Sequence, residues 1–420
     1  MSASPARACG VDFGTSNSTV GWLRPGVRPL LALEDGRPTL PSAVFFNADE
    51  DSTHFGREAM AQYLDGYEGR LVRSLKSLLG SSLIDAHTEV AGRALPFRAL
   101  LTTFIGELKL RAEAAAGRSF DCAVFGRPVF FVDDDAEADR RAEDTLAEIA
   151  RAVGFRELSF QYEPLGAAYH YEQTLAREEV VLIADIGGGT TDFSLVRLGP
   201  ERARSEDRQA DLLASGGVHI GGTDFDRVLN LACAMPHFGL GSRGRTGAPL
   251  PSSLYFQLAT WHTIPLAYSR AAWNDCQQLY RLGGERSLLD RLSRLIERRA
   301  GHWLALQVEQ AKIALSDTER TQLALTEYFP ELDASIGRPD FTQASAELVG
   351  RVVTTLATLL QQAGLHHQQV DTLFFTGGGS GVPQLREAIA ALLPAARACE
   401  GDRFGSIGAG LAVAAARRYG

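Results

Sequence analysis

Two segments of the sequence combine an aspartate, a glycine-rich turn and hydroxyl side chains in the same order. Residues 8–20 contain Asp12 before the turn, and residues 181–196 contain Asp185 before the turn. In both segments β-branched and aromatic residues flank the turn, and glycine permits the positive φ angles of a tight hairpin. The pattern therefore predicts two β-hairpins of one design.

Turns of this kind are suited to binding a chain of phosphate groups. Phosphates need backbone N–H groups that no Cβ shields, hydroxyl donors, and a metal ion that shares the charge. Because Mg²⁺ keeps several water ligands in proteins, Asp12 and Asp185 are the candidates for holding it. The candidates for holding phosphate are Gly14, Thr15 and Ser16 in the first turn and Gly187, Gly188, Gly189 and Thr190 in the second.

One glycine turn alone is more often an ordinary hairpin than a binding site, but the matched pair favours a site. The spacing of the glycines excludes other motifs. The sequence has no Gly-x4-Gly-Lys-Ser/Thr motif and no Gly-x-Gly-x-x-Gly at a strand-to-helix turn. The run at 378–381 also lacks the Gly-x-Ser-x-Gly spacing of a nucleophile elbow.

The other elements suggest a duplicated α/β architecture, because a hairpin precedes a helix of small residues in each half. Hydrophobic spacing predicts helices over 100–116, 133–153, 288–315 and 385–393, buried strands over 123–125 and 370–375, and small-residue helix starts at 163–169 and 404–412. We expect lobe I to comprise residues 1–178 and 400–420, with an inserted subdomain at about 38–120. We expect lobe II to comprise residues 179–399, with a subdomain at about 219–340.

Composition indicates an ordinary folded chain of 420 residues, with 45% hydrophobic and 22% charged residues. The net charge is −9 with basic and acidic residues interleaved, which argues against a nucleic-acid partner. The five cysteines are far apart and include no Cys-x-x-Cys pair, so a reducing, cytoplasmic location is expected. Neither a signal peptide nor a membrane span is expected.

Seven segments together resemble the seventy-kilodalton heat-shock chaperones (heat shock protein 70, DnaK-type), whose ATPase region has the actin-like fold with ribonuclease H-like lobes. The segments are GVDFGTSNS at 10–18, EPLGAA at 163–168, ADIGGGTTDFS at 184–194, HIGGTDFD at 219–226, VEQAKIALS at 308–316, FTGGGSGVP at 375–383 and SIGAGLA at 406–412. The resemblance spans nearly the whole chain and implies ATP or ADP with Mg²⁺ as cofactors.

The resemblance also implies roles for residues that spacing alone leaves open. Lys76 matches a phosphate-facing catalytic lysine, Glu163 a residue that binds the metal's water shell, and Asp185 with Thr190 would position the attacking water. Further nucleotide contacts are implied for Gly221, Gly222, Asp224, Glu309, Lys312, Ser316, Gly377, Gly378, Gly379 and Asp402.

Two features depart from the family pattern. Ile313 and Gly381 stand where family members usually carry the arginines that sandwich adenine, so weaker or less adenine-selective binding is expected. Because the sequence ends at Gly420, the family's peptide-binding domain is not expected, and the chain resembles the shorter YegD-type members, with an enlarged second-lobe insertion at roughly 236–308.

The expected function is that of a slowly hydrolysing ATP-dependent switch related to chaperones, acting on an unknown client or co-chaperone. A small-molecule kinase on the same fold and an actin-like filament protein remain alternatives.

Overall fold

The computed structural model describes residues 7–79, 81–90, 93–132, 135–205, 208–402 and 405–420. The chain forms two compact units, the first made of residues 1–217, 358–380 and 393–420, and the second of residues 218–357 and 381–392. This division reflects how compactly the residues pack and does not define the two lobes. The lobe boundaries expected from the sequence therefore remain a prediction. The first unit contains both of the large sheets.

The first sheet begins with the hairpin that the sequence predicts. Its strands are β1 (Ala8–Asp12), β2 (Asn17–Gly21), β3 (Thr39–Pro41), β9 (Cys122–Arg127) and β10 (Glu157–Tyr162), in the order β10-β9-β1-β2-β3. Strands β1, β9 and β10 are parallel, whereas β2 is antiparallel to β1. The residues that follow β1 and β10 therefore lie at the same edge of the sheet.

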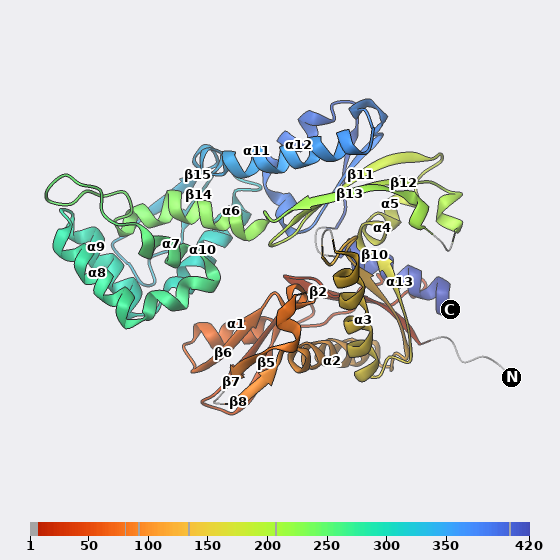
Figure 1. Cartoon of the computed structure of the whole chain (residues 1–420), viewed down its shortest axis with the longest axis horizontal. Helices are drawn as coiled ribbons and strands as arrows, with labels where there is room; N and C mark the ends of the chain where they lie inside the picture. Colours follow the sequence, from red (N-terminus) through yellow and green to blue (C-terminus); the bar gives the residue numbers. More distant parts are fainter. Residues whose placement is uncertain (1–6, 80, 91–92, 133–134, 206–207, 403–404) are drawn as a thin grey trace. The chain divides into compact units, whose positions relative to one another are not determined.

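Helices cover this sheet because its central strand is apolar on both faces. All five residues of β1 are buried. Helices α2 (Phe97–Ala116) and α3 (Ala136–Ala152) are labelled in Figure 1. They share a core with β1 that includes Phe104, Leu146 and Val11. The predicted helices at 100–116 and 133–153 are confirmed, although residues 133–134 lie outside the described residues.

The second sheet repeats this plan. Its strands are β11 (Glu179–Ile186), β12 (Thr191–Leu198), β13 (Leu212–Val218), β16 (Thr372–Thr376) and β17 (Arg397–Glu400), in the order β13-β12-β11-β16-β17. Strands β11 and β12 form the predicted hairpin, and β16 runs parallel to β11. A hairpin with parallel strands beside it thus occurs in both sheets, as the duplication predicted.

Small residues allow two helices to approach closely, as the sequence predicts. Helix α4 (Glu163–Ala167) follows β10, and helix α13 (Ser406–Tyr419) is the last helix of the chain. A Cβ placed on Gly410 would lie 2.0 Å from the carbonyl oxygen of Gly166, so only glycine fits there. Phe404, the first residue of the predicted small-residue segment, lies outside the described residues.

The segment inserted between β3 and β9 forms a three-stranded sheet, a two-stranded sheet and helices. Its elements are β4 (Ala43–Asn47), β5 (Ser52–Phe55), α1 (Gly56–Leu64), β6 (Gly69–Arg73), β7 (His87–Val90), β8 (Arg93–Pro96) and α2. The three-stranded sheet has the order β5-β4-β6.

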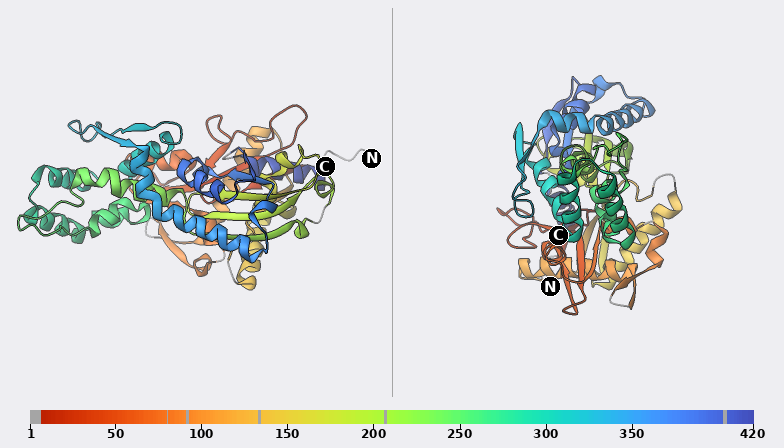
Figure 2. Two further views of the ribbon diagram at one scale, coloured as in Figure 1. Left: turned by 90° about the horizontal axis from the view of Figure 1, so that it is seen from above. Right: turned by 90° about the vertical axis from the view of Figure 1, so that its left-hand side faces the viewer.

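The second unit is mainly helical. Its elements are α6 (Gly222–Leu229), α7 (Ser253–Ala259), α8 (Arg270–Leu282), α9 (Arg286–Glu297), α10 (Gly301–Ala314), β14 (Arg320–Leu323), β15 (Ala334–Gly337) and α12 (Pro383–Leu392), and it also holds most of α11 (Arg338–Gln362). Helices α7 to α10, green to teal, remain together as a bundle when the molecule is turned (Figure 2).

The prediction of one continuous helix over 288–315 is wrong. Helix α9 ends at Glu297 and α10 begins at Gly301. Between them Arg299 adopts a φ of 51°, and the Gly301 N–H donates to the Tyr268 hydroxyl at 2.9 Å. A Cβ on Gly301 would lie 2.8 Å from that hydroxyl oxygen. A tertiary contact therefore breaks a stretch whose apolar spacing is helical throughout.

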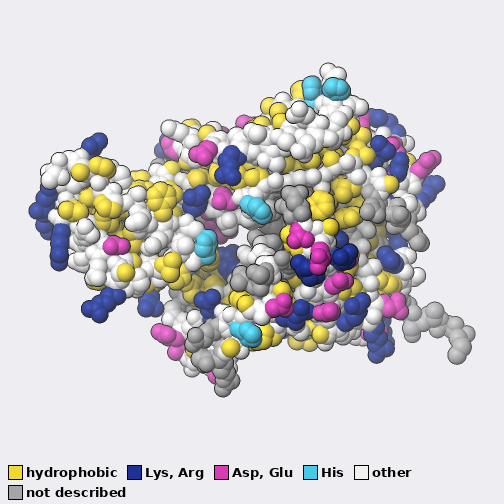
Figure 3. Space-filling model, in the orientation of Figure 1, with side chains coloured by type: hydrophobic (Ala, Val, Ile, Leu, Met, Phe, Trp, Pro, Cys, Tyr) yellow, Lys and Arg dark blue, Asp and Glu magenta, His cyan; other side chains and the backbone are white. Residues whose placement is uncertain are grey.

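Charged side chains are interleaved over much of the visible surface (Figure 3). At the end formed by α8 and α9, however, Lys and Arg side chains predominate in this view, and Arg281, Arg286, Arg298 and Arg299 are exposed there. None of the helices in the described ranges is long and apolar enough to cross a membrane.

Candidate functional site

The first glycine turn is fixed by contacts that leave its backbone tightly folded. Asp12 ends β1 and pairs with Thr19 of β2. The Ser42 hydroxyl donates to the carbonyl oxygen of Gly14 at 2.6 Å, and the Ser42 N–H donates to that of Ser16 at 2.9 Å. Ser42, the residue before β4, therefore holds in place the turn that carries Gly14, Thr15 and Ser16.

The second glycine turn is closed by a hydrogen bond between its own residues. The Gly187 N–H donates to the carbonyl oxygen of Thr190 at 2.9 Å. Asp185 lies opposite Asp192 across the hairpin, and the Thr190 hydroxyl donates to Asp192 Oδ2 at 2.8 Å. This bond orients Thr190, one of the predicted phosphate ligands.

The two turns meet inside the first unit. A Cβ on Gly188 would lie 2.1 Å from Ser16 Oγ. The sequence predicted each turn separately; the structure places the backbone of one against the hydroxyl of the other. Asp12 is the last residue of β1 and Asp185 the last but one of β11, and both strands lead directly into this contact.

Lys76 and Glu163 form an ion pair beside these aspartates. Lys76 lies in a short 3-10 helix, Leu75–Leu78, which the chain enters through Ser74 in a left-handed conformation with φ 57°. Glu163 is the first residue of α4, directly after β10. The side chains are only 11% and 10% exposed. Two residues assigned through the family resemblance are thus brought together.

The pKa values show that the group is crowded with negative charge. Burial, followed by the charge of Glu163, raises the pKa of Asp12 to about 8, although Lys76 opposes this. Burial, then Asp192 and Glu163, raise the pKa of Asp185 to about 7. For Lys76, burial acts to lower the pKa, but Glu163 and the two aspartates outweigh it and the pKa is raised.

These residues fit a hydrated divalent cation. Three carboxylates, those of Asp12, Glu163 and Asp185, face a single ammonium group, so an added positive charge would relieve their repulsion. Among the described residues, no group of three or more Asp, Glu, His or Cys side chains is close enough to ligate a metal directly. A Mg²⁺ ion here would therefore be held through its own waters, as the sequence predicted for Asp12 and Asp185.

Stability should fall with rising pH when no cation is present. Asp12 and Asp185 bind protons more tightly in the folded chain than their usual pKa of 3.8 implies. Their stabilising contribution is therefore complete below about pH 4 and is lost as the pH rises through about 7–8. We expect the melting temperature with EDTA to drop between about pH 4 and 8, and Mg²⁺ to restore it.

A matched pair of variants tests this dependence. Asp12→Asn should flatten the pH profile of the melting temperature, whereas Asp333→Asn, at an exposed position, should leave it unchanged. An unchanged profile in Asp12→Asn would contradict the assigned protonation.

A third glycine turn lies against the second. Strand β16 pairs Thr376 with Asp185, and Gly377 follows with φ +82°. A Cβ on Gly377 would lie 2.5 Å from Asp185 Oδ1, and a Cβ on Gly379 would lie 2.5 Å from Ile186 Cγ2. Gly377, Gly378 and Gly379 thus belong to the same cluster of turns, although their predicted contact with the nucleoside remains a prediction.

Six predicted nucleotide contacts lie in the second unit, on α6 and α10 or within two residues of their ends. They are Gly221, Gly222, Asp224, Glu309, Lys312 and Ser316. Asp224 caps α6 by accepting the Gly221 N–H at 3.1 Å. Lys312 Nζ lies 2.8 Å from Asp226 Oδ1 in an ion pair and donates to the carbonyl oxygen of Gly222 at 3.1 Å, so its ammonium group joins the two helices.

Asp402 is exposed, and its main chain caps the last helix. Its carbonyl oxygen accepts the Ser406 hydroxyl at 2.7 Å and the Ser406 N–H at 3.2 Å. The Asp402 side chain takes no part in these two hydrogen bonds, so the implied nucleotide contact of Asp402 remains a prediction.

Asp192 is a site residue that the sequence reasoning missed. It binds Thr190, and it is the strongest charge acting on Asp185. The signal was present in the hairpin itself: a four-residue turn after Ile186 places position 192 opposite 185.

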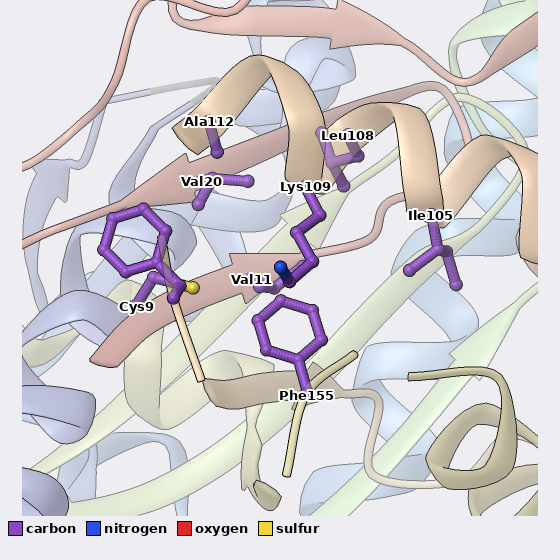
Figure 4. Close-up of a pocket in the computed structure, with 9 residues that line it drawn as sticks. Cys9, Val11, Val20, Ile105, Leu108, Lys109, Ala112 and Phe155 are labelled. Atoms are coloured by element: carbon purple, nitrogen blue, oxygen red, sulfur yellow. The ribbon is translucent and has the colours of Figure 1, made fainter. Parts of the chain in front are cut away.

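A small cavity behind β1 does not belong to this site. It lies between β1, β2 and α2, with the ammonium group of Lys109 next to the ring of Phe155 (Figure 4). Its free volume of about 10 Å³ is roughly that needed for one water molecule. It is too small for a nucleotide.

Comparisons with known proteins identify relatives over almost the whole chain. It is 29% identical to the chaperone protein HscA of Pectobacterium carotovorum over 412 residues, 93% of this chain and 55% of that protein. It is 28% identical to the HscA homologue of Bordetella pertussis over 405 residues, 92% of this chain and 54% of that protein. The chain thus spans about half the length of the curated relatives it matches. Membership of the YegD-type subgroup remains a prediction.

The family model described as Hsp70 protein matches residues 88–235 and 292–416, well over half of the chain. These segments include Glu163, the second glycine turn, the helix with Lys312 and the third glycine turn. The mixed sheets and duplicated hairpins agree with the actin-like fold of that family. The chain therefore belongs to the Hsp70 family.

Proposed function

We propose that the protein binds ATP with Mg²⁺ and hydrolyses it slowly, as a chaperone-related conformational switch. The observation that supports this best is the contact between the two glycine turns, with Asp12, Asp185 and the Lys76–Glu163 pair beside it. Hsp70 family members are ATPases that use Mg²⁺. Like the relatives named chaperone protein, this protein would act on a client or with a co-chaperone.

Each residue has a proposed part in the reaction. Backbone N–H groups of both turns, together with Thr15, Ser16 and Thr190, would bind the outer phosphates. Lys76 would stabilise the charge that spreads over the transferring phosphoryl group. Asp185 and Thr190 would orient the attacking water. Mg²⁺, when bound through waters held by Asp12, Asp185 and Glu163, would share the phosphate charge.

The γ-phosphate would also provide the switch. Because ATP reaches both turns through its γ-phosphate and ADP does not, ATP would favour the closed arrangement of the turns by the difference in its affinities for the two states. The output of that closure is the proposed regulation of a client or co-chaperone.

One experiment measures phosphate release and conformational change together. Purified protein with Mg²⁺ and ATP, without any acceptor, should release phosphate slowly, and hydrogen exchange at the glycine turns should decrease relative to the nucleotide-free protein. Asp185→Asn should reduce both effects. If Asp185→Asn leaves ATP binding and turnover unchanged, the proposal is wrong.

The same assay distinguishes the other functions that the sequence leaves open. A kinase would consume ATP only when its acceptor is present, and a filament protein would sediment with ATP at high speed. Either result would contradict the proposed switch and support the corresponding alternative function.

Nucleobase selectivity should be low. Ile313 is 51% exposed on α10, in the turn that also carries Lys312 and Glu309, and neither Ile313 nor Gly381 offers a planar cation to stack on adenine. Each missing cation–π contact removes about 0.5–2 kcal/mol. We expect calorimetric affinities for ATP and GTP within about tenfold of each other.

The reverse substitution is the control. Ile313→Arg should raise the ATP affinity, whereas Leu110→Arg, at an apolar position that is 61% exposed on α2, should not. Nanomolar ATP binding with strong selectivity in the natural chain would contradict this prediction.

A further inference from the structure

A serine, a histidine and a glutamate form a hydrogen-bonded chain away from the glycine turns, where β5 meets α1. Ser52 Oγ lies 2.8 Å from His54 Nε2, and His54 Nδ1 lies 2.9 Å from Glu58 Oε1. Ser52 and His54 are two residues apart on a strand and so share one face of the sheet. Glu58 lies in the first turn of α1, which follows that strand directly.

The carboxylate fixes the form of the imidazole. An ionised glutamate only accepts hydrogen bonds, so Nδ1 of His54 must carry the proton in this pair. In the neutral ring Nε2 then bears the lone pair, and it faces the Ser52 hydroxyl. A serine with a base at Nε2 and an acid at Nδ1 is the arrangement that activates a hydroxyl nucleophile.

We propose that Ser52, His54 and Glu58 form a second reactive site, which accepts acyl groups from small carboxylic esters. Ser52 is partly buried and the His54 side chain is 15% exposed, whereas Glu58 is 59% exposed. The site is thus open on one side, which suits a small ester. Strand β5 is at the edge of the sheet β5-β4-β6, and an edge strand has N–H groups that do not pair within its sheet, which in this proposal would donate to the oxyanion.

The reaction conserves atoms and charge without a further reactant. The Ser52 oxygen attacks the ester carbonyl while its proton passes to His54 Nε2. The tetrahedral intermediate then breaks its bond to the alcohol oxygen, and this leaving group takes the proton from His54. Water attacks the acyl-Ser52 ester in the same way, which releases the carboxylic acid and restores the hydroxyl. Glu58 positions the ring and stabilises its positive charge.

A fluorophosphonate probe and p-nitrophenyl acetate test the site in the full chain. The probe should label Ser52, as located by peptide mass spectrometry, and the ester should be hydrolysed faster than in buffer. Ser52→Ala should abolish labelling at this peptide, and Ser52→Ala or His54→Gln should lower ester turnover by at least about tenfold. Glu58→Gln should lower kcat and leave KM unchanged, a split that a purely structural role would not give.

Ser242→Ala is the matched control, because the Ser242 hydroxyl donates to the Gly239 carbonyl at 2.7 Å and faces no base in that bond. It should leave labelling and turnover unchanged, and all variants should keep the wild-type melting temperature within about 3 °C. Labelling that is absent at Ser52, or turnover that is equal in wild type and Ser52→Ala, would overturn the proposal.

Discussion

Lys76→Met should lower the rate of ATP hydrolysis by at least about 100-fold while the protein remains folded. In the structure Lys76 is the only ammonium group paired with Glu163, and it also acts on Asp12 and Asp185. Without it, three carboxylates would face the phosphates with no cation from the protein, and the transition-state charge would lose its stabilising partner. Removal of one such group from a preorganised site costs about 10²–10³ in kcat.

Lys109→Met is the matched control for this change. The chain has only three lysines, Lys76, Lys109 and Lys312. Each forms an ion pair, and each lysine side chain is at most 14% exposed. Lys109 pairs with Glu113 on α2 at 2.5 Å, beside the small cavity. Its loss should destabilise the fold by about 1–3 kcal/mol and leave turnover within about twofold. Single-turnover phosphate release and denaturant unfolding measure the two effects separately.

Equal losses of turnover in Lys76→Met and Lys109→Met would show that a buried lysine matters only for folding. Full activity in Lys76→Met would remove this residue from the proposed mechanism.

Gly410→Ala should destabilise the protein strongly although alanine is the better helix former. The added Cβ would lie 2.0 Å from the Gly166 carbonyl oxygen and 2.9 Å from its Cα, both of them backbone atoms of α4. Backbone cannot rotate away as a flexible side chain can, so α13 and α4 must separate. Such overpacking costs about 1–3 kcal/mol, and because α4 begins at Glu163, turnover should also fall.

Gly350→Ala is the matched control, and we expect it to change the stability in the opposite direction. Gly350 lies inside α11 and a Cβ there would have no atom within 4 Å. Alanine should therefore stabilise the protein by about 0.5–1 kcal/mol through its helix propensity. Urea midpoints of the two variants, measured side by side, should move in opposite directions. A stabilised Gly410→Ala variant would contradict the close approach of the two helices.

Local chemistry explains why much of the fold could be predicted from the sequence. The hairpins at Asp12 and Asp185 follow from glycine in the turns and β-branched residues beside them, which depend on neighbours in the chain. The helix expected over 288–315 failed because Gly301 binds the Tyr268 hydroxyl, a residue 33 positions away. Apolar spacing carries no information about such a bond.

The residues of the candidate site also divide into those that the sequence could predict and those that it could not. The glycines of the first two turns, with Asp12 and Asp185, were predicted from spacing. Lys76, Glu163 and the third glycine turn were assigned only through the family resemblance. Asp192 and the bracing serine, Ser42, were missed, because their importance lies in bonds across the hairpin and from outside the turn.

The sequence by itself predicted two glycine turns, which we propose bind phosphate, and a resemblance to the Hsp70 family. Only the tertiary structure decided the state of the groups around those turns. The Lys76–Glu163 pair joins residues 87 positions apart, and the raised pKa values of Asp12 and Asp185 arise from burial and from charges on other helices and strands. Turn conformation depends on a few neighbouring dihedral angles, whereas desolvation and Coulomb energy depend on distances that exist only once the chain has folded.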